Sequence, residues 1–105
     1  MGEHMLVITT CDDADAATRL GESLVEARLA ACVQVVGPIR SIYRWEGAVT
    51  SSAEWQLHVK TSADRVEGVT EHIVARHGYD VPEVIAVPVV GGNRAYLDWV
   101  TAETR

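Results

Sequence analysis

The chain has 105 residues, of which 48% are apolar, and its 15 acidic against nine basic residues give a formal net charge of −6. This size and composition suit one domain with one core and argue against disorder. The acidic balance argues against nucleic-acid binding, and Met5 to Ile8, the longest early apolar run, is too short for a signal peptide or a membrane span. We therefore expect a single cytoplasmic domain over residues 1–105, without a membrane partner and with a flexible amino-terminal segment at residues 1–4.

The first predicted elements are a strand and a helix. Met5 to Thr10 is short, rich in β-branched residues and followed by a polar turn, which is typical of a buried strand. A helix is expected from about Asp13 to Leu29, because aspartates can cap its start. Its apolar face recurs at steps of three and four, at Leu20, Leu24, Ala27 and Ala31.

A long hairpin is expected next. Its first strand begins at Cys32 and runs to Trp45 with a bend or bulge at Gly37-Pro38; after a turn at Glu46-Gly47, the second strand ends at Thr61. Alternation in the second strand puts Trp55, Leu57 and Val59 on an apolar face and Glu54, Gln56, His58 and Lys60 on a polar one. This hairpin is too long for the outer strands to pair with it throughout, so we expect association to cover its overhang.

The second half of the chain predicts a helix, a strand and a short terminal helix. The helix opens at residues 61–64 with Thr61 or Ser62 as its cap, and ends at a left-handed Gly78. Prolines bracket an edge strand at Val84 to Val87, and Asn93 caps a helix over residues 95–102. The order of elements predicts an α+β fold of the ferredoxin-like split βαβ type (βαββαβ), with an antiparallel sheet, a long central hairpin and a C-terminal helix.

Five segments resemble, in order and spacing, the signature segments of the CutA divalent-cation tolerance family. They are Leu29–Val33, Ser41–Gly47, Lys60–Thr61, His77–Ile85 and Tyr96–Val100. The resemblance spans about residues 5–100. It implies a ferredoxin-like subunit, a PII-like homotrimer whose hairpins reach neighbouring subunits, and a role in tolerance of copper and other divalent metals.

Cys11 and His77 are the candidate metal ligands. A thiolate and an imidazole suit copper or zinc, and three subunits could pool such ligands. The resemblance likewise implies Cu²⁺ binding by a cysteine near the end of the first strand and by histidine at the end of the second helix. A helix cap is the competing role for His77. No obligatory cofactor is expected, and Cys32 is interpreted as an inert packing thiol.

The polar strand face and the aromatic residues suggest a second site. Lys60 is the only lysine, and it could pair with Glu54 or Glu83, bind an anionic ligand, or simply belong to a solvated face. The aromatic residues either pack or line a pocket between subunits. The candidate interface pocket comprises Tyr43, Trp45, Glu54, Lys60, Tyr79, Glu83, Tyr96 and Trp99.

Three functions remain open at this point. The first is a metal-linked trimeric binding protein, the second a PII-like signalling adaptor that binds a small anionic ligand between subunits, and the third a purely structural, stable trimer. An enzyme is not expected, because the sequence has no Ser-His-Asp pattern, phosphate loop, nucleotide fingerprint or HExxH. The acidic neighbours of Cys11 also argue against a nucleophilic thiolate.

Overall fold

The computed structural model describes residues 3–105. Its elements follow the predicted order. They are β1 (His4–Cys11), α1 (Ala14–Glu26), β2 (Cys32–Trp45), β3 (Ala48–Ser62), the 3₁₀ turn η1 (Ala63–Arg65), α2 (Val66–Arg76), β4 (Ile85–Pro88) and α3 (Arg94–Glu103).

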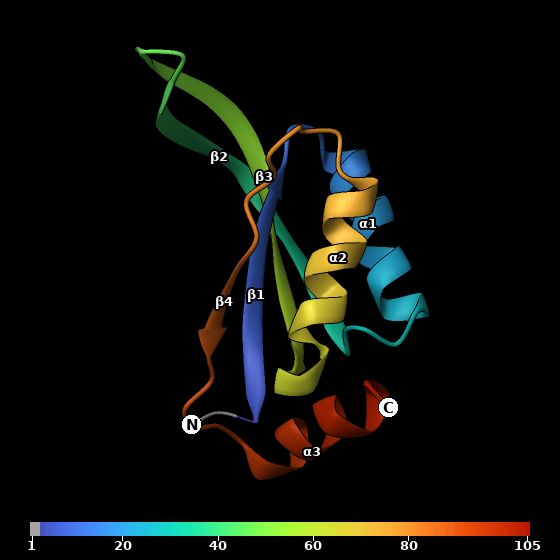
Figure 1. The fold of residues 1–105 in the computed structure, drawn as a ribbon. Coiled ribbons are helices and arrows are strands. Elements are labelled where there is room, and N and C mark those ends of the chain that lie inside the picture. Colours follow the sequence, from blue (N-terminus) through green and yellow to red (C-terminus); the bar gives the residue numbers. More distant parts are fainter. Residues whose placement is uncertain (1–2) are drawn as a thin grey trace.

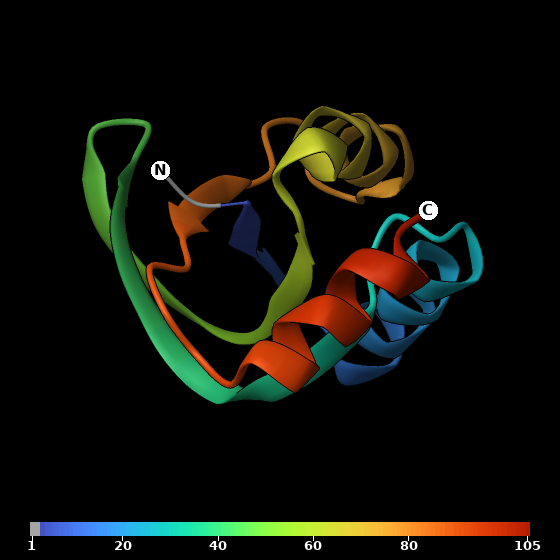
Figure 2. The same ribbon diagram turned by 90° about the horizontal axis from the view of Figure 1, so that it is seen from below.

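The four strands form one antiparallel sheet in the order β2-β3-β1-β4, which confirms the ferredoxin-like arrangement and the edge position of β4. Helices α1 and α2 cover one face of the sheet, and α3 lies across the end where β1 begins (Figure 1). Seen from that end, α1 and α2 stay on one side and the hairpin tip curves away from them (Figure 2). No helix of the described chain covers the opposite face of the sheet.

The β2–β3 hairpin is longer than its neighbours in the sheet. Strand β1 pairs with β3 only as far as Cys11 opposite Trp55, so residues 48–54 of β3 have no partner on that side. The tip therefore extends beyond β1 (Figure 1), with Ile42 and Val49 each 69% exposed. The register shifts between Val36 and Ile39, which confirms the predicted irregularity at Gly37-Pro38.

The core lies between the sheet and the two helices that cover it. Val7, Leu57 and Val59 point from β1 and β3 toward this side and are fully buried. Leu20 and Leu24 of α1 and Val69 and Ile73 of α2 complete the cluster. The predicted alternation of β3 is thus confirmed, because its apolar residues are the ones that the helices cover.

Two features predicted for the second helix are wrong. Ser62 is the N-cap residue of η1 by position, and Arg65 that of α2, but neither Thr61 nor Ser62 makes a side-chain capping bond. The Thr61 hydroxyl donates to the carbonyl of Leu29 at 2.6 Å instead, and the Ser62 hydroxyl pairs with that of Thr104 at 2.6 Å. Gly78 is not left-handed either; the helix ends at Arg76, and His77 continues in extended backbone with φ −79° and ψ 148°. At the start of the helix, tertiary hydrogen bonds thus occupy both hydroxyls that could have capped it.

The other helix boundaries follow the prediction more closely. Asp13 caps α1 by accepting from Ala16 N at 3.1 Å, but this helix ends at Glu26 rather than Leu29, since Arg28 takes a positive φ of 60°. Asn93 caps α3 by accepting from Ala95 N at 3.0 Å. Across residues 3–105, no helix is both long and apolar enough to cross a membrane.

The expected flexible segment at residues 1–4 is wrong at His4. This residue opens β1, is 6% exposed, and shares a hydrogen bond of 2.8 Å between its Nε2 and the Thr101 hydroxyl of α3. Residues 1 and 2 lie outside the described residues.

Candidate functional site

Five predicted residues gather at the end of β1 that lies beside the overhang of the hairpin. We call this group the Cys11 cluster; it contains Cys11 at the end of β1, Glu54 on β3, and His77, Tyr79 and Glu83 from the segment that follows α2. The sequence places these residues up to 72 positions apart. The antiparallel pairing of β1 with β3 brings Cys11 close to Glu54, and hydrogen bonds of His77 and Tyr79 hold the segment after α2 against both strands.

His77 connects this segment to β1 through both of its ring nitrogens. Nδ1 accepts the backbone N–H of Tyr79 at 3.0 Å, so Nδ1 carries no proton. Nε2 lies 2.6 Å from the carbonyl oxygen of Thr10 and must therefore donate to it. The ring is thus the neutral Nε2–H tautomer, held by the backbone on both sides.

The sulfur of Cys11 lies 3.8 Å from Nε2 of His77. With zinc bond lengths of about 2.3 Å to sulfur and 2.0 Å to nitrogen, tetrahedral ligands would be about 3.5 Å apart. The pair therefore has nearly the spacing that a shared metal needs. Metal binding would, however, have to displace the Nε2 proton that now bonds Thr10.

Glu54 is the buried carboxylate of the cluster, at 8% exposure. Its Oε2 accepts the hydroxyl of Tyr79 at 2.7 Å. Burial, followed by this hydrogen bond and the charge of Glu54, raises the pKa of Tyr79, so the phenol stays protonated and donates. The rings of Tyr79 and His77 also contact each other, with centroids 4.7 Å apart.

The electrostatics of the cluster are strongly anionic. Burial, then the charges of Asp12, Glu54 and Asp13, raises the pKa of the Cys11 thiol. Burial and the charge of Glu54 also raise the pKa of Glu83. Both pKa values shift in the direction expected of buried acidic groups that have other negative charges, and no cation, beside them.

No cation of the described chain neutralises this cluster. The salt bridges among residues 3–105 join Arg28 to Glu103, Arg94 to Asp98 and Arg105 to Asp64, and none includes Glu54 or Glu83. Nor do three or more His, Cys, Asp or Glu side chains of that part of the chain come together as a metal-holding group. The single chain therefore offers ligand types and negative charge, but an incomplete coordination shell.

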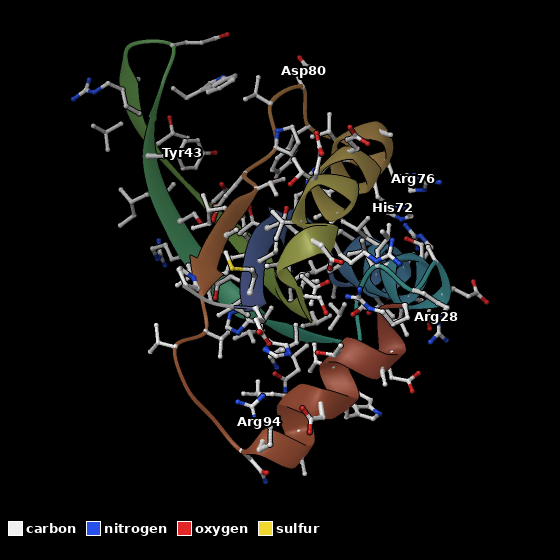
Figure 3. All side chains as sticks on the ribbon, turned by 60° about the horizontal axis from the view of Figure 1, so that its bottom comes forward. Arg28, Tyr43, His72, Arg76, Asp80 and Arg94 are labelled. Atoms are coloured by element: carbon white, nitrogen blue, oxygen red, sulfur yellow. The ribbon has the colours of Figure 1, made fainter. Side chains whose placement is uncertain are left out.

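The other predicted pocket residues lie elsewhere. Lys60 and Tyr96 line a cavity of about 240 Å³ at the opposite end of the sheet, and Trp99 contacts Tyr96 with ring centroids 5.6 Å apart. Tyr43 and Trp45 lie on the hairpin, where Tyr43 is well separated from the helices (Figure 3). Within the single chain the eight predicted pocket residues thus occupy three regions.

Sequence reasoning missed the backbone partners of the cluster. The carbonyl of Thr10 and the N–H of Tyr79 determine how the His77 ring is oriented. The amino-acid type of a residue does not indicate which backbone groups its side chain will bond. The closeness of His77 and Tyr79 along the chain is the one sequence feature that points to the bond between them. The hydroxyl of Thr9, fully buried without a partner in the described structure, was also not anticipated.

The fold and the cluster define an α+β protein of ferredoxin-like topology, with an overhanging hairpin and an acidic, thiol-bearing sheet end. A family model described as "CutA1 divalent ion tolerance protein" matches residues 5–103. The chain belongs to this CutA1 family.

Relatives and solved structures agree with that membership. "Protein CutA, chloroplastic" of Arabidopsis thaliana is 46% identical over 101 residues, which cover 96% of this chain but 56% of the plant protein. The chain thus spans little more than half the length of that relative. The divalent-cation tolerance protein CutA of Thermus thermophilus is 42% identical over 94% of this chain and 96% of its own length. The crystal structure of CutA1 from Oryza sativa superposes with a TM-score of 0.96 at 44% identity, covering 99% of this chain and 95% of that one.

Proposed function

We propose that this protein acts in divalent-cation tolerance as a homotrimer, and that it holds a metal ion such as Cu²⁺ where the Cys11 cluster meets a neighbouring subunit. The observation that carries the proposal is the buried Glu54 carboxylate beside Cys11 and Glu83, with no cation of its own chain paired to it. A buried carboxylate needs a compensating charge. A divalent cation supplies that charge and also suits the oxygen, sulfur and nitrogen donors present.

Association is supported by the surface that one subunit leaves open. The sheet has one face without helices in the described chain, and β2 is a free edge strand of 14 residues. The hairpin tip exposes Ile42, Trp45 and Val49. Long free edges and exposed apolar tips are features that protein–protein contacts normally cover. A neighbouring subunit would also supply the ligands that the Cys11 cluster lacks.

Light scattering tests the assembly. We expect a mass near three times the 11.4 kDa of one chain. The double variant Ile42→Ser/Val49→Ser, which removes apolar surface from the hairpin tip, should shift the protein toward single subunits. A wild-type mass of one subunit would overturn the trimer.

Calorimetric titration with Cu²⁺ and Zn²⁺ tests the metal site. Cys11→Ser and Glu54→Gln should each weaken binding by about tenfold or more, as expected when a ligand or its partner is lost. His77→Ala tests the same site but also removes two backbone bonds, so Cys11→Ser is the cleaner variant. His72→Ala, which removes an imidazole from the helical side, is the matched control. Equal affinity in Cys11→Ser, Glu54→Gln and the control would refute the site.

A second candidate function rests on Lys60. Its ammonium donates to the side-chain amide oxygen of Gln34 rather than to a carboxylate, and it lines the 240 Å³ cavity with Tyr96. This leaves a charge that could bind a small anionic ligand between subunits, as in PII-like signalling. Calorimetry with nucleotides separates the two candidates: binding that is lost in Lys60→Ala but retained in Cys11→Ser favours the second.

A further inference from the structure

A small pocket lies between α1 and α2, on the helical side of the molecule and on a different element pair from the Cys11 cluster. It has a volume of about 210 Å³ and is lined by Ala16, Arg19, Leu20, Ser23 and Arg76. Arg76 lies beside His72 on this side, whereas Tyr43 lies on the distant hairpin (Figure 3). The pocket does not include the sheet face or the hairpin that we assign to subunit contacts.

Two arginines line this pocket, and neither has a carboxylate partner among the described residues. Neither Arg19 nor Arg76 takes part in any salt bridge among residues 3–105. The one protein acceptor of Arg76 in that part of the chain is the carbonyl of His72, in a long contact of 3.5 Å. Most N–H donors of both side chains are therefore free, on a chain whose net charge is −6.

The pocket lining also includes Ser23, whose hydroxyl already has two hydrogen-bond partners. The Ser23 hydroxyl has a single proton and donates it to the carbonyl of Leu20 at 2.7 Å. The 2.8 Å contact between Ser23 Oγ and His72 Nε2 must then be a donation from the imidazole. His72 consequently does not act as a base toward Ser23, and the pair is arranged for binding rather than for nucleophilic attack.

The chemistry of these donors selects the ligand. A guanidinium presents two parallel N–H groups that match the oxygens of a phosphate, and two guanidiniums match its double charge. We propose that Arg19 and Arg76 bind a small dianion of the phosphate-monoester class at this pocket. The bound dianion accepts from both arginines, and Ser23 offers it no further proton.

His72 reports on occupancy because it contacts two residues of the pocket lining, Ser23 and Arg76. Burial, and then the charge of Arg76, lowers its pKa. The groups placed against it are Ser23 of α1 and Arg76 of its own helix, and no carboxylate contributes to the shift. A dianion between the arginines offsets the charge of Arg76, so binding raises the pKa of His72.

The test is an NMR titration of the full chain with methyl phosphate at constant ionic strength and about pH 7.5, where a phosphate monoester carries nearly two charges. We expect saturable shifts of the Arg19 and Arg76 side chains and of the His72 ring, with a dissociation constant below about 10 mM. Arg19→Gln and Arg76→Gln should each weaken binding by at least about threefold, and the double variant should abolish it.

Arg94→Gln is the matched control, because it removes one charge from an exposed helical arginine elsewhere on the chain. It should leave the affinity within about twofold. The proposal is overturned if the shifts remain linear, if acetate binds as tightly as methyl phosphate, or if Arg94→Gln weakens binding as much as Arg76→Gln. None of these outcomes depends on the metal site or on the assembly of subunits.

Discussion

The hydroxyl of Tyr79 donates to Oε2 of Glu54 at 2.7 Å, although 25 positions separate the two residues along the chain. This bond joins the segment after α2 to the start of the hairpin overhang. Tyr79→Phe would leave a carboxylate that is 8% exposed without this donor. We expect the free energy of unfolding to fall by about 1–3 kcal/mol, measured by urea denaturation at neutral pH.

Tyr43→Phe is the control for this first prediction. It removes an exposed hydroxyl bond to Ser52 of 2.9 Å on the hairpin. That loss should change the free energy of unfolding by less than about 0.5 kcal/mol. Equal effects of the two substitutions would show that the Tyr79–Glu54 bond has no special stabilising role.

Glu83 gives a prediction about pH. Its pKa in the folded protein lies above the ordinary value of 4.5, because of burial and then the charge of Glu54. The folded state therefore keeps this proton to higher pH than the unfolded state does. The free energy of unfolding falls as pH rises from 4.5 through the folded pKa.

Glu83→Gln removes this penalty, because glutamine does not ionise. The variant should be more stable than wild type at neutral pH in the presence of a chelator, and the advantage should shrink toward pH 4. Urea denaturation across this range measures both effects. Glu71→Gln, at an exposed position on α2, should not reproduce the pattern. A wild type more stable than Glu83→Gln at neutral pH would contradict the assignment.

The thiol of Cys11 should ionise only at a higher pH than an ordinary thiol does. Burial is the first cause of its raised pKa and Asp12 the second. In a Cys32→Ser background, the rate of reaction with a thiol reagent should still be rising above pH 9.0, the ordinary thiol value. Asp12→Asn should move the midpoint down, whereas Asp15→Asn, which lies outside the causes of the shift, should not. A midpoint at or below the ordinary value would contradict the burial of this group.

Gly37 is required where the hairpin bends. A methyl group added at this position would lie 2.5 Å from Cδ1 and 3.0 Å from Cα of Trp55, so the backbone of β3 would have to move. Gly37→Ala should destabilise the fold by about 1–3 kcal/mol in thermal or urea denaturation.

Gly78→Ala is the matched control for that substitution. A methyl group there meets nothing within 4 Å, and the backbone has no positive φ. This variant should be neutral or more stable, by up to about 1 kcal/mol. Strong destabilisation by Gly78→Ala would mean that the left-handed conformation expected from the sequence is needed after all.

The fold could be predicted because its signals are local. Alternation at Trp55, Leu57 and Val59 identified the buried face of β3, and Asn93 identified the start of α3. Gly37-Pro38 located the irregularity of the hairpin. Each of these signals depends on residues within a few positions of one another.

The features that could not be predicted depend on distant partners. Ser62 has the sequence signature of a cap, yet its hydroxyl bonds Thr104, 42 positions away. Cys11 and His77 were named as a pair, but the use of both imidazole nitrogens by the backbone follows only from the three-dimensional structure. The eight aromatic and charged residues assigned to one pocket lie in three separate regions, because residue type alone does not determine position along the sheet.

The position of β1 in the middle of the sheet has a consequence for the order in which the chain assembles. This strand precedes the other elements of the fold in the chain, but its two neighbours are β3 and β4, whose pairing residues begin at Trp55 and Ile85. During synthesis β2 and β3 can close as a local hairpin, while the central strand must wait for segments that emerge much later. The apolar face of β1 therefore lacks its sheet neighbours until β3 and β4 have emerged, and this is the interval in which the nascent protein is most open to aggregation.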